Sequence, residues 1–488
     1  MSEVADICLI IEGSYPFVTG GVASWMQRLI KSYENEFTFA VVALAAGKKT
    51  EEDLRYPLPD NVIFMKGVDL FDYSEIRDAE PTKFSRAEQK EVYEQIGQLA
   101  HINFAKGKLT EEQRCLFRDI LQKHKEGFFK HFLAKESGLE LLTEIYDKKR
   151  SKEGFIKYYY NWRNIHLAIW RVFMLTNILP EAKLYHAPAT GFSGFLACMM
   201  TELYDKPSVI TEHGIYIQER DMDLSVAEWL DEEYMRDMWR DFFKGLTKFQ
   251  YETVTRLITL YNGNRELAAE YGADPEKVEV IPNGIQIERF QKARRTRLIK
   301  GEVPVIGIVG RVDSVKDMKT YLNVSAIIKN AIPNIQSYVV GPTEEVESYY
   351  KECLALRELL KAEDYVTFTG PADVVEYYKI FDILLLTSVK EAMPLTVMEA
   401  MASGLPVVAT RVGACEELLN GSGDDKLGVA GYVATIMDSQ DIAMKTLEIL
   451  NNPELANKMA QTGIERIETY YLETMLEDAY REVYKSLM

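Results

Sequence analysis

The chain has 488 residues, more than a single hydrophobic core usually supports, so two domains are expected. With 57 Lys and Arg against 75 Asp and Glu, the formal net charge is −18, which argues against nucleic acid or an anionic membrane as a general partner. The five cysteines are scattered, no apolar run approaches the roughly 18 residues of a membrane helix, and the start does not resemble a signal peptide, so a cytoplasmic protein without disulfides or a transmembrane segment is expected.

The first elements in chain order are a strand, a glycine-containing loop and a helix. Residues 5–11 form an apolar run typical of a buried parallel strand, and apolar residues then recur at helical spacing over 22–30. Further strands are expected at 37–44, 62–65, 183–186, 208–213, 257–261 and 278–282. Residues 71–171 are rich in charge and poor in glycine and proline, with helices expected at 87–99 and 111–133. We therefore expect a Rossmann-like first domain, residues 1–290, with a helical insertion.

The second half of the chain has a more regular pattern, which begins after the basic segment 291–300. Strands expected at 305–309, 336–340, 366–369, 383–387 and 406–409 alternate with helical stretches. This alternation predicts a parallel sheet with helices on both faces, and hence a second Rossmann-like domain over 291–468. Residues 469–488 are expected to form a helix that crosses back to the first domain. The predicted fold class is α/β, with two Rossmann-like domains facing a central cleft.

Ligands of such sheets bind at the carboxyl ends of the strands, and two loops there carry glycines or cations. Gly20 and Gly21 precede the first helix, where a glycine backbone can approach a phosphate closely, although a glycine pair is also ordinary in a turn. Arg311 and Lys316 follow the strand 305–309 and can neutralise a diphosphate, although they are also compatible with a solvated basic pair.

Carboxylates and histidines follow other strands. Pro394 favours a first helical turn, which places Glu391 in the preceding loop and Glu399 in the second turn of the helix. Carboxylates suit sugar hydroxyls because an ionised oxygen accepts several hydrogen bonds, but glutamates at this spacing are more often surface residues. His186 and His213 end two neighbouring strands, where each either contacts a ligand or satisfies nearby backbone. No third ligand with recognisable spacing accompanies them, so no metal site is expected.

In combination, these residues resemble the signature of family 4 glycosyltransferases, which are retaining enzymes of GT-B fold. The segments 12–25, 190–194, 211–220, 261–265, 281–285 and 415–418 are more closely similar to the soluble glycosyltransferases of bacterial Pel exopolysaccharide synthesis. Thr19 and Lys390 depart from that pattern, and either residue is able to alter donor or acceptor preference.

The resemblance implies a UDP-sugar as cosubstrate, a glycan acceptor, inner-membrane Pel synthase proteins as partners, and no metal or other cofactor. Arg311 and Lys316 would hold the diphosphate, Glu399 the ribose and Glu391 the transferred hexose, with His213 beside the reacting carbon. Further donor contacts are expected from the following residues: Gly20, Gly21, Asn283, Phe368, Met393, Pro394, Leu395 and Thr396. Candidates on the acceptor side are His186, Thr190 and Glu212.

Two other functions share parts of this pattern. A nucleotide-sugar epimerase of GT-B fold would need several acid and base groups around the sugar, of which the sequence offers only His213 and Glu391. A non-catalytic scaffold that binds nucleotide sugars in a membrane synthase complex would not need an intact set of charged residues.

Overall fold

The computed structural model describes residues 4–83, 85, 109–124, 127, 130, 136–149, 154–298 and 302–488. The chain divides into two compact units. The first unit comprises Met1–Thr259, Asn264–Val280 and Arg481–Met488, and the second comprises Leu260–Gly263 and Ile281–Tyr480. The helix expected at 87–99 lies outside the described residues.

The first unit is built on a seven-stranded parallel sheet in the order β3-β2-β1-β4-β5-β6-β7. Its central strands are apolar almost throughout because both faces of the sheet are covered. The strands are β1 (Ala5–Glu12), β2 (Phe39–Ala45), β3 (Val62–Asp69), β4 (Ala182–Ala187), β5 (Ser208–Glu212), β6 (Arg256–Thr259) and β7 (Val278–Val280).

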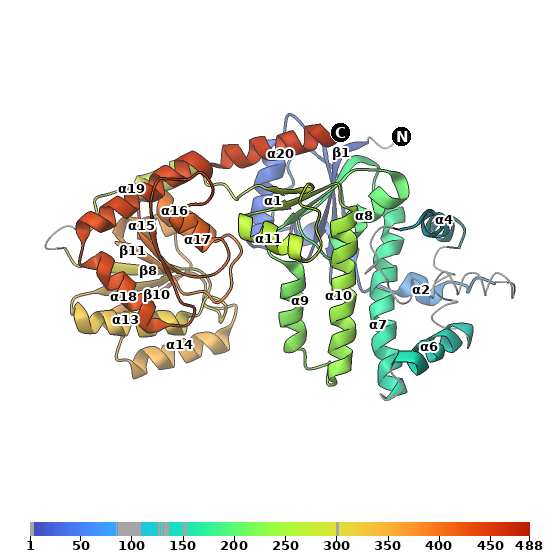
Figure 1. Ribbon diagram of the computed structural model, residues 1–488, viewed down its shortest axis with the longest axis horizontal. Helices are drawn as coiled ribbons and strands as arrows, with labels where there is room; N and C mark the ends of the chain where they lie inside the picture. The colour runs from blue at the N-terminus through green and yellow to red at the C-terminus, as the bar shows by residue number, and fades with distance from the viewer. Residues whose placement is uncertain are drawn as a thin grey trace. The chain divides into compact units, whose positions relative to one another are not determined.

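Helices cover this sheet, and α7, α8 and α10 pack side by side along it (Figure 1). The described elements between β3 and β4 are all helices. The helices that lie wholly or mainly in this unit are α1 (Gly21–Ser32), α2 (Ser74–Asp78), α4 (Glu111–Asp119), α6 (Glu136–Lys149), α7 (Phe155–Met174), α8 (Phe192–Tyr204), α9 (Tyr216–Ser225), α10 (Glu233–Thr253) and α11 (Asn262–Glu270).

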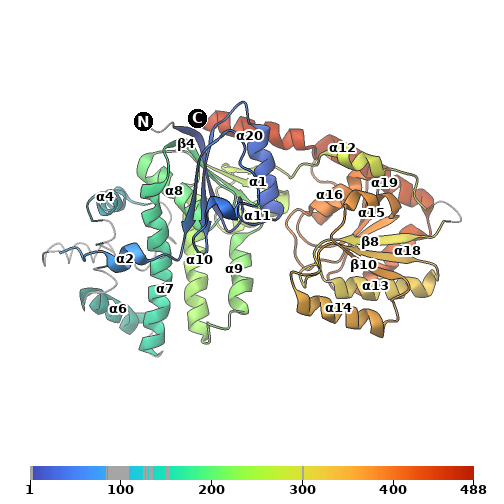
Figure 2. The ribbon, with the colours of Figure 1, turned by 180° about the vertical axis from the view of Figure 1, so that it is seen from behind.

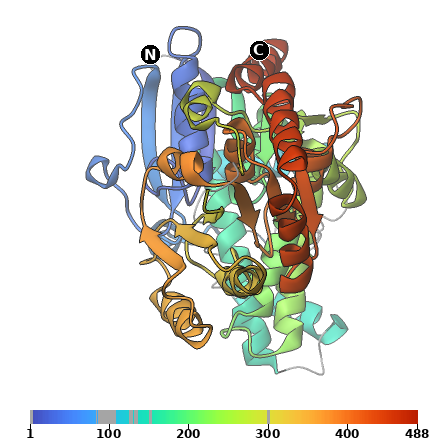
Figure 3. The same ribbon diagram turned by 90° about the vertical axis from the view of Figure 1, so that its left-hand side faces the viewer.

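The second unit is a six-stranded parallel sheet in the order β10-β9-β8-β11-β12-β13, with helices on both faces (Figures 2 and 3). Side chains of β11 alternate between two cores: Ile383 and Leu385 enter one, and Leu384 and Leu386 enter the other. The strands are β8 (Val305–Val309), β9 (Gln336–Val340), β10 (Val366–Gly370), β11 (Ile383–Leu386), β12 (Val407–Thr410) and β13 (Gly431–Ala434). The helices are α12 (Ile287–Phe290), α13 (Met318–Ala331), α14 (Glu347–Leu359), α15 (Val374–Ile380), α16 (Leu395–Ala402), α17 (Cys415–Asn420), α18 (Ser439–Leu450) and α19 (Pro453–Tyr470).

These two sheets confirm the predicted pair of Rossmann-like domains. The five strands expected in the second half all form, and β13 is an additional edge strand that the sequence did not predict.

The basic segment with which the predicted second domain begins is packed into the second unit over its described residues 291–298. The Arg297 side chain is fully buried, and its guanidinium donates hydrogen bonds to several backbone carbonyls, among them those of Phe381 at 2.7 Å and Ser403 at 2.7 Å. The units divide at Val280, so the basic residues serve packing rather than a free linker.

The C-terminal segment, expected as one helix over 469–488, is divided. Helix α19 ends at Tyr470, Leu472 forms a parallel bridge with Ile285, and α20 (Glu473–Leu487) begins after it. The last residues of α20 belong to the first unit, where Arg481 and Lys485 both pair with Glu36, at 2.8 and 2.6 Å.

Candidate active site

A largely buried ion pair joins the loops that follow the neighbouring strands β8 and β11. Lys316 Nζ lies 2.5 Å from Glu391 Oε1, and the two side chains are only 18% and 13% exposed. The same carboxylate oxygen accepts a hydrogen bond from Ser388 Oγ at 2.6 Å. Among the described residues, Glu391 Oε2 has no recorded donor, so one oxygen of this carboxylate is available to a ligand hydroxyl.

The two loops are held together by further hydrogen bonds. Val389 N donates to Val315 O at 2.8 Å, and Thr387 Oγ1 donates to Lys316 O at 2.9 Å. From the next strand, Thr410 Oγ1 donates to Ser388 O at 2.6 Å. The positions of Lys316 and Glu391 are therefore set by the edge of the sheet and not by their own side chains alone.

Gly310 makes room for the lysine. Its φ is 156°, and a Cβ placed there would lie 3.3 Å from Lys316 Cε and 3.4 Å from Cδ. A side chain at this position would therefore displace the aliphatic part of Lys316, which explains why the strand-end residue is a glycine.

Arg311 lies near this pair but has other partners. Its side chain is 57% exposed and pairs with Glu345 at 2.8 Å and with Asp313 at 3.4 Å. The hydrogen bond to Glu345 raises the pKa of Arg311, and the charge of Glu391 adds a smaller contribution in the same direction. The sequence correctly placed this cation at the strand end but did not predict its acidic partners.

The first turn of α16 presents unpaired hydrogen-bond donors. Pro394 is the N-cap, one position before its predicted place, and no side chain caps the helix. Val397 and Met398 donate their backbone N–H groups to Pro394 O, whereas in the described part of the chain no acceptor is recorded for those of Leu395 and Thr396. Thr396 Oγ1 is also buried without a partner. A helix start with free donors attracts an anion.

Asn283 lies against the same segment. It is 7% exposed, its backbone N–H faces Met393 Sδ at 3.3 Å, and its Nδ2 donates to Met393 O at 3.4 Å. This contact fixes the backbone just before α16.

Glu399 lies in the second turn of α16, as predicted. One of its carboxylate oxygens accepts a hydrogen bond from the buried Tyr378 hydroxyl at 3.0 Å. Burial raises the pKa of Tyr378 and the carboxylate raises it further, so the tyrosine stays protonated and orients Glu399.

Phe368 is less clearly placed for a ligand. Its ring packs edge-on against Tyr350 of α14, with centroids 5.4 Å apart, and Arg357 lies over it at 5.9 Å. Its expected contact with a nucleotide base stays a prediction.

In the first unit, His213 follows β5 and packs edge-to-face against Trp25 of α1, with ring centroids 4.9 Å apart. Its Nε2 is buried and has no hydrogen-bond partner among the described residues. Burial lowers the pKa of His213 to about 4, so the ring is neutral at pH 7 and can offer a hydrogen bond but no positive charge.

Gly20 and Gly21 form the start of α1. Gly20 is the N-cap in an extended conformation, and neither a side-chain cap nor an acidic residue occupies the first turn. A Cβ at either glycine would meet nothing within 4 Å, so packing inside the first unit does not account for the pair.

The three residues expected on the acceptor side lie in the interior. His186 is fully buried, and its ring nitrogens bond Tyr484 Oη at 2.8 Å and Thr211 Oγ1 at 2.9 Å, which leaves neither for an acceptor. Thr190 Oγ1 donates to Glu212 Oε1 at 3.0 Å, and Tyr251 Oη donates to Glu212 Oε2 at 2.6 Å. His186 is therefore hydrogen-bonded within the first unit, and Thr190 and Glu212 form a buried hydrogen-bonded network. The acceptor contacts expected of these three residues stay predictions.

Glu12 is a strand-end carboxylate that sequence reasoning missed. Its Oε2 accepts the N–H groups of Phe192 at 3.0 Å and Ser193 at 3.4 Å, at the start of α8. Burial raises its pKa, although these hydrogen bonds act in the opposite direction. The signal was present, because Glu12 follows a buried strand directly.

In the described part of the chain, no group of three or more His, Cys, Asp or Glu side chains is arranged to hold a metal ion.

Comparisons with known proteins agree with this architecture. Residues 289–466 match the family model "Glycosyl transferases group 1", and residues 5–276 match "Domain of unknown function (DUF3492)". The structure is similar to that of Anabaena HepE in complex with UDP, with a TM-score of 0.60 at 15% identity, covering 99% of this chain and 100% of that one. A sucrose-phosphate synthase from Thermosynechococcus elongatus also has a TM-score of 0.60, at 16% identity and 99% coverage of both chains.

Curated relatives are similar over shorter stretches. An Escherichia coli protein named UDP-Gal:alpha-D-GlcNAc-diphosphoundecaprenol alpha-1,3-galactosyltransferase is 27% identical over 241 residues, which are 46% of this chain and 57% of the relative. A D-inositol 3-phosphate glycosyltransferase of Segniliparus rotundus is 31% identical over 155 residues, 30% of this chain and 34% of the relative. The chain spans about half the length of the curated relatives it matches.

The two parallel-sheet units and these neighbours define a protein of GT-B fold whose second unit carries a group 1 glycosyl transferase domain. The chain belongs to the family that shares the DUF3492 domain, because that model matches more than half of its 488 residues. None of the described helices is long and apolar enough to cross a membrane.

Proposed function

We propose that the chain is a retaining glycosyltransferase that moves a hexose or N-acetylhexosamine from a UDP-sugar onto a glycan acceptor. The observation that carries this proposal is the Lys316–Glu391 pair beside the uncapped start of α16. It combines a cation and free N–H donors, suited to a diphosphate, with a carboxylate suited to sugar hydroxyls. The Escherichia coli relative, whose name specifies UDP-Gal, supports UDP as the nucleotide.

In this proposal Lys316, Arg311 and the backbone over 393–396 bind the diphosphate, Glu399 the ribose, and Glu391 the transferred sugar. Arg311 would exchange its contact with Glu345 for the ligand. The assignments of Gly20, Gly21, Asn283, Phe368 and His213 to the donor are retained as part of the proposal.

The reaction proposed is front-face transfer without a metal ion. The bond between the sugar C1 and the diphosphate oxygen breaks, and the acceptor hydroxyl oxygen forms the new bond on the same face. The acceptor proton passes to the departing phosphate oxygen. Lys316 and Arg311 stabilise the negative charge that grows on the diphosphate, which is an electrostatic contribution to the rate.

We further propose that this reaction serves bacterial Pel exopolysaccharide synthesis, in the role of PelF, with inner-membrane Pel synthase proteins as partners. The support is the similarity of the strand-end segments at 12–25, 190–194 and 211–220, which lie in the part of the chain that matches DUF3492.

The test is to titrate the full chain with UDP-glucose, UDP-N-acetylglucosamine and UDP-N-acetylgalactosamine, and to measure binding by calorimetry and UDP release in parallel. We expect one of the three to bind and be turned over. Binding without release of UDP, with glycan present, would favour the scaffold alternative, and no binding of any UDP-sugar would refute both.

A further inference from the structure

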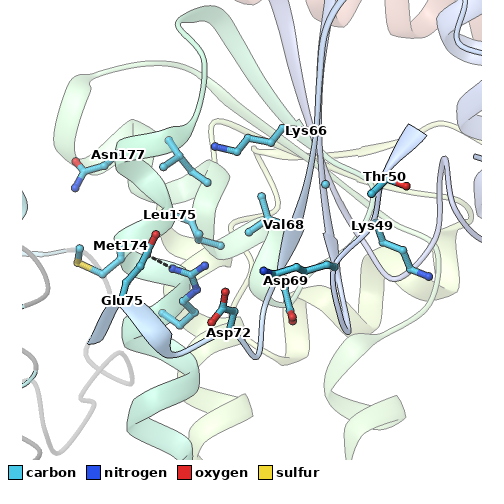
Figure 4. Close-up of a pocket in the computed structure, with 14 residues that line it drawn as sticks. Lys49, Thr50, Lys66, Val68, Asp69, Asp72, Glu75, Met174, Leu175 and Asn177 are labelled. Carbon is cyan, nitrogen blue, oxygen red and sulfur yellow. Dashed lines mark hydrogen bonds and ion pairs between the residues drawn. The ribbon is translucent and has the colours of Figure 1, made fainter. Parts of the chain in front are cut away.

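A pocket of about 400 Å³ lies within the first unit beside its edge strand β3 (Figure 4). Its walls come from β3, from the turn after β2, and from the segment where α7 passes into the short helix Leu175–Ile178. None of the residues assigned above to a UDP-sugar or its acceptor lines it. Its size falls within the range of roughly 300–1,000 Å³ common for small-molecule sites.

Four cationic side chains line this pocket: Lys48, Lys49, Lys66 and Arg171. In the described part of the chain, none of the three lysines has a recorded ion pair with a carboxylate. Lys183 of the same unit, by contrast, lies 2.7 Å from Asp6.

Arg171 is the buried member of the set. Its side chain is 10% exposed, and one terminal nitrogen donates to Glu75 at 2.7 Å. Its Nε is buried and has no hydrogen-bond partner among the described residues. Buried donors are normally satisfied, so this N–H is a position at which a ligand acceptor would complete the structure.

Each acidic residue of the pocket binds the protein through one of its carboxylate oxygens. Asp69 Oδ1 accepts the backbone N–H groups of Gly47 and Phe71, each at 3.0 Å. Asp72 accepts the N–H of Ser74 at 3.0 Å, and Glu75 binds Arg171. With four cations against these three carboxylates, 4 − 3 leaves a formal charge of +1 among the residues that line the pocket.

An apolar wall faces these charges. Val68 and Leu175 are 5% and 1% exposed, and Met174 and Ile178 also line the pocket. Val68, Leu175 and Met174 are labelled in Figure 4. Thr50 and Asn177 add neutral polar groups that suit hydroxyls.

We propose that this pocket is a second ligand site, which binds a compact organic anion of monosaccharide size, a sugar phosphate or a sugar carboxylate. The anionic group contacts Lys48, Lys66 and Arg171 Nε, and the sugar ring lies against Val68 and Leu175. This site is separate from the proposed UDP-sugar site and does not depend on it.

The test is calorimetric titration of the full chain with glucose 1-phosphate, glucuronate, inorganic phosphate and glucose. We expect one of the two sugar anions to bind more tightly than either inorganic phosphate or glucose, and the preferred one identifies the anionic group. The double variant Lys48→Gln/Lys66→Gln should bind that probe at least about tenfold more weakly, because two charge-assisted contacts are lost. Lys31→Gln, an exposed lysine on α1, is the matched control and should bind as the native chain does.

A second pair of measurements separates this site from the donor site. Lys316→Ala should leave binding of the sugar anion unchanged, and the double variant should leave UDP affinity unchanged. Absence of binding by both sugar anions, equal binding of glucose, equal binding of inorganic phosphate, or loss of the sugar anion in Lys316→Ala but not in the double variant would each overturn the proposal.

Discussion

Side chains at the strand ends of the second unit are charged, whereas burial favours the neutral forms of the side chains at the strand ends of the first unit. Lys316 and Glu391 form an ion pair that remains partly open to solvent. In the first unit, burial lowers the pKa of His186 to about 3 and of His213 to about 4, and raises that of Glu212 to about 7. The sheet edge of the second unit is therefore suited to stabilising negative charge, and that of the first unit to offering neutral hydrogen bonds.

The largest test of this contrast is Lys316→Ala. We expect turnover to fall about a hundredfold to a thousandfold, equivalent to about 2.7 to 4 kcal/mol, because a preorganised charge opposite the leaving group is lost. UDP release from the preferred UDP-sugar is the measurement. Lys319→Ala, which removes a lysine paired with Glu352 on the surface, is the control. Near-native turnover in a folded Lys316→Ala protein would remove this residue from the mechanism.

The neutral side of the contrast is tested by the pH dependence of unfolding. In the unfolded chain, His186 binds a proton as the pH falls below 6.5, its usual pKa, whereas in the folded chain its pKa is about 3. Protonation therefore favours the unfolded chain, and stability that is present at pH 7 is lost as the pH falls. Between pH 7 and pH 5, His186 should lower the free energy of unfolding by about 2 kcal/mol. Denaturant unfolding of the native chain and of His186→Gln should therefore diverge over that interval. Parallel pH curves would show that His186 is not held neutral.

Substitution of Glu399 tests whether the second unit binds the ribose of UDP as well as its diphosphate. Glu399→Ala should weaken UDP binding about tenfold with little change in stability, because a hydrogen bond to a charged acceptor is lost. Calorimetry with UDP is the measurement, and Glu416→Ala, which removes an exposed carboxylate paired with Arg411, is the control. Unchanged UDP affinity in Glu399→Ala would refute the ribose contact.

The smallest effect concerns Arg311, which pairs with Glu345 across an exposed surface. If this arginine turns to the diphosphate, Glu345→Gln removes a competitor and should tighten UDP binding about twofold to threefold, in line with the small energy of exposed ion pairs. Glu352→Gln is the matched control. Weaker UDP binding in Glu345→Gln would indicate that the carboxylate positions Arg311 for the ligand instead.

The fold was largely predictable because its determinants are local. The central strands β8 and β11 are short apolar runs, and the alternation of strands with helices indicates a parallel sheet. β13 escaped prediction because Tyr432 and Val433 are only half-buried on an edge strand, next to Gly431. Likewise, the break between α19 and α20 depends on Ile285, far away in the sequence.

The site was predictable only in part for the same reason. Gly310, Lys316 and Glu391 could be found from their places after strands, but their pairing depends on β8 lying next to β11. His186 occupies a comparable strand end, yet its partner Tyr484 is 298 residues away, and nothing in the local sequence indicates that its ring is fully engaged. The packing of the basic segment that begins the predicted second domain could not be predicted, because the carbonyls that Arg297 binds belong to residues far away in the sequence.

The loop that carries Glu391 rests on a second loop, after β12. Gly413 has a φ of 50°, and a Cβ there would lie 2.0 Å from Ala392 O, while Ala414 N donates to that same carbonyl at 2.7 Å. Gly413 and Ala414 thus form a backbone support for the loop of Glu391 without contributing a side chain to it. For enzyme engineering, Gly413 has to stay a glycine in any library that seeks to alter the loop of Glu391, because any other residue would clash with Ala392 O.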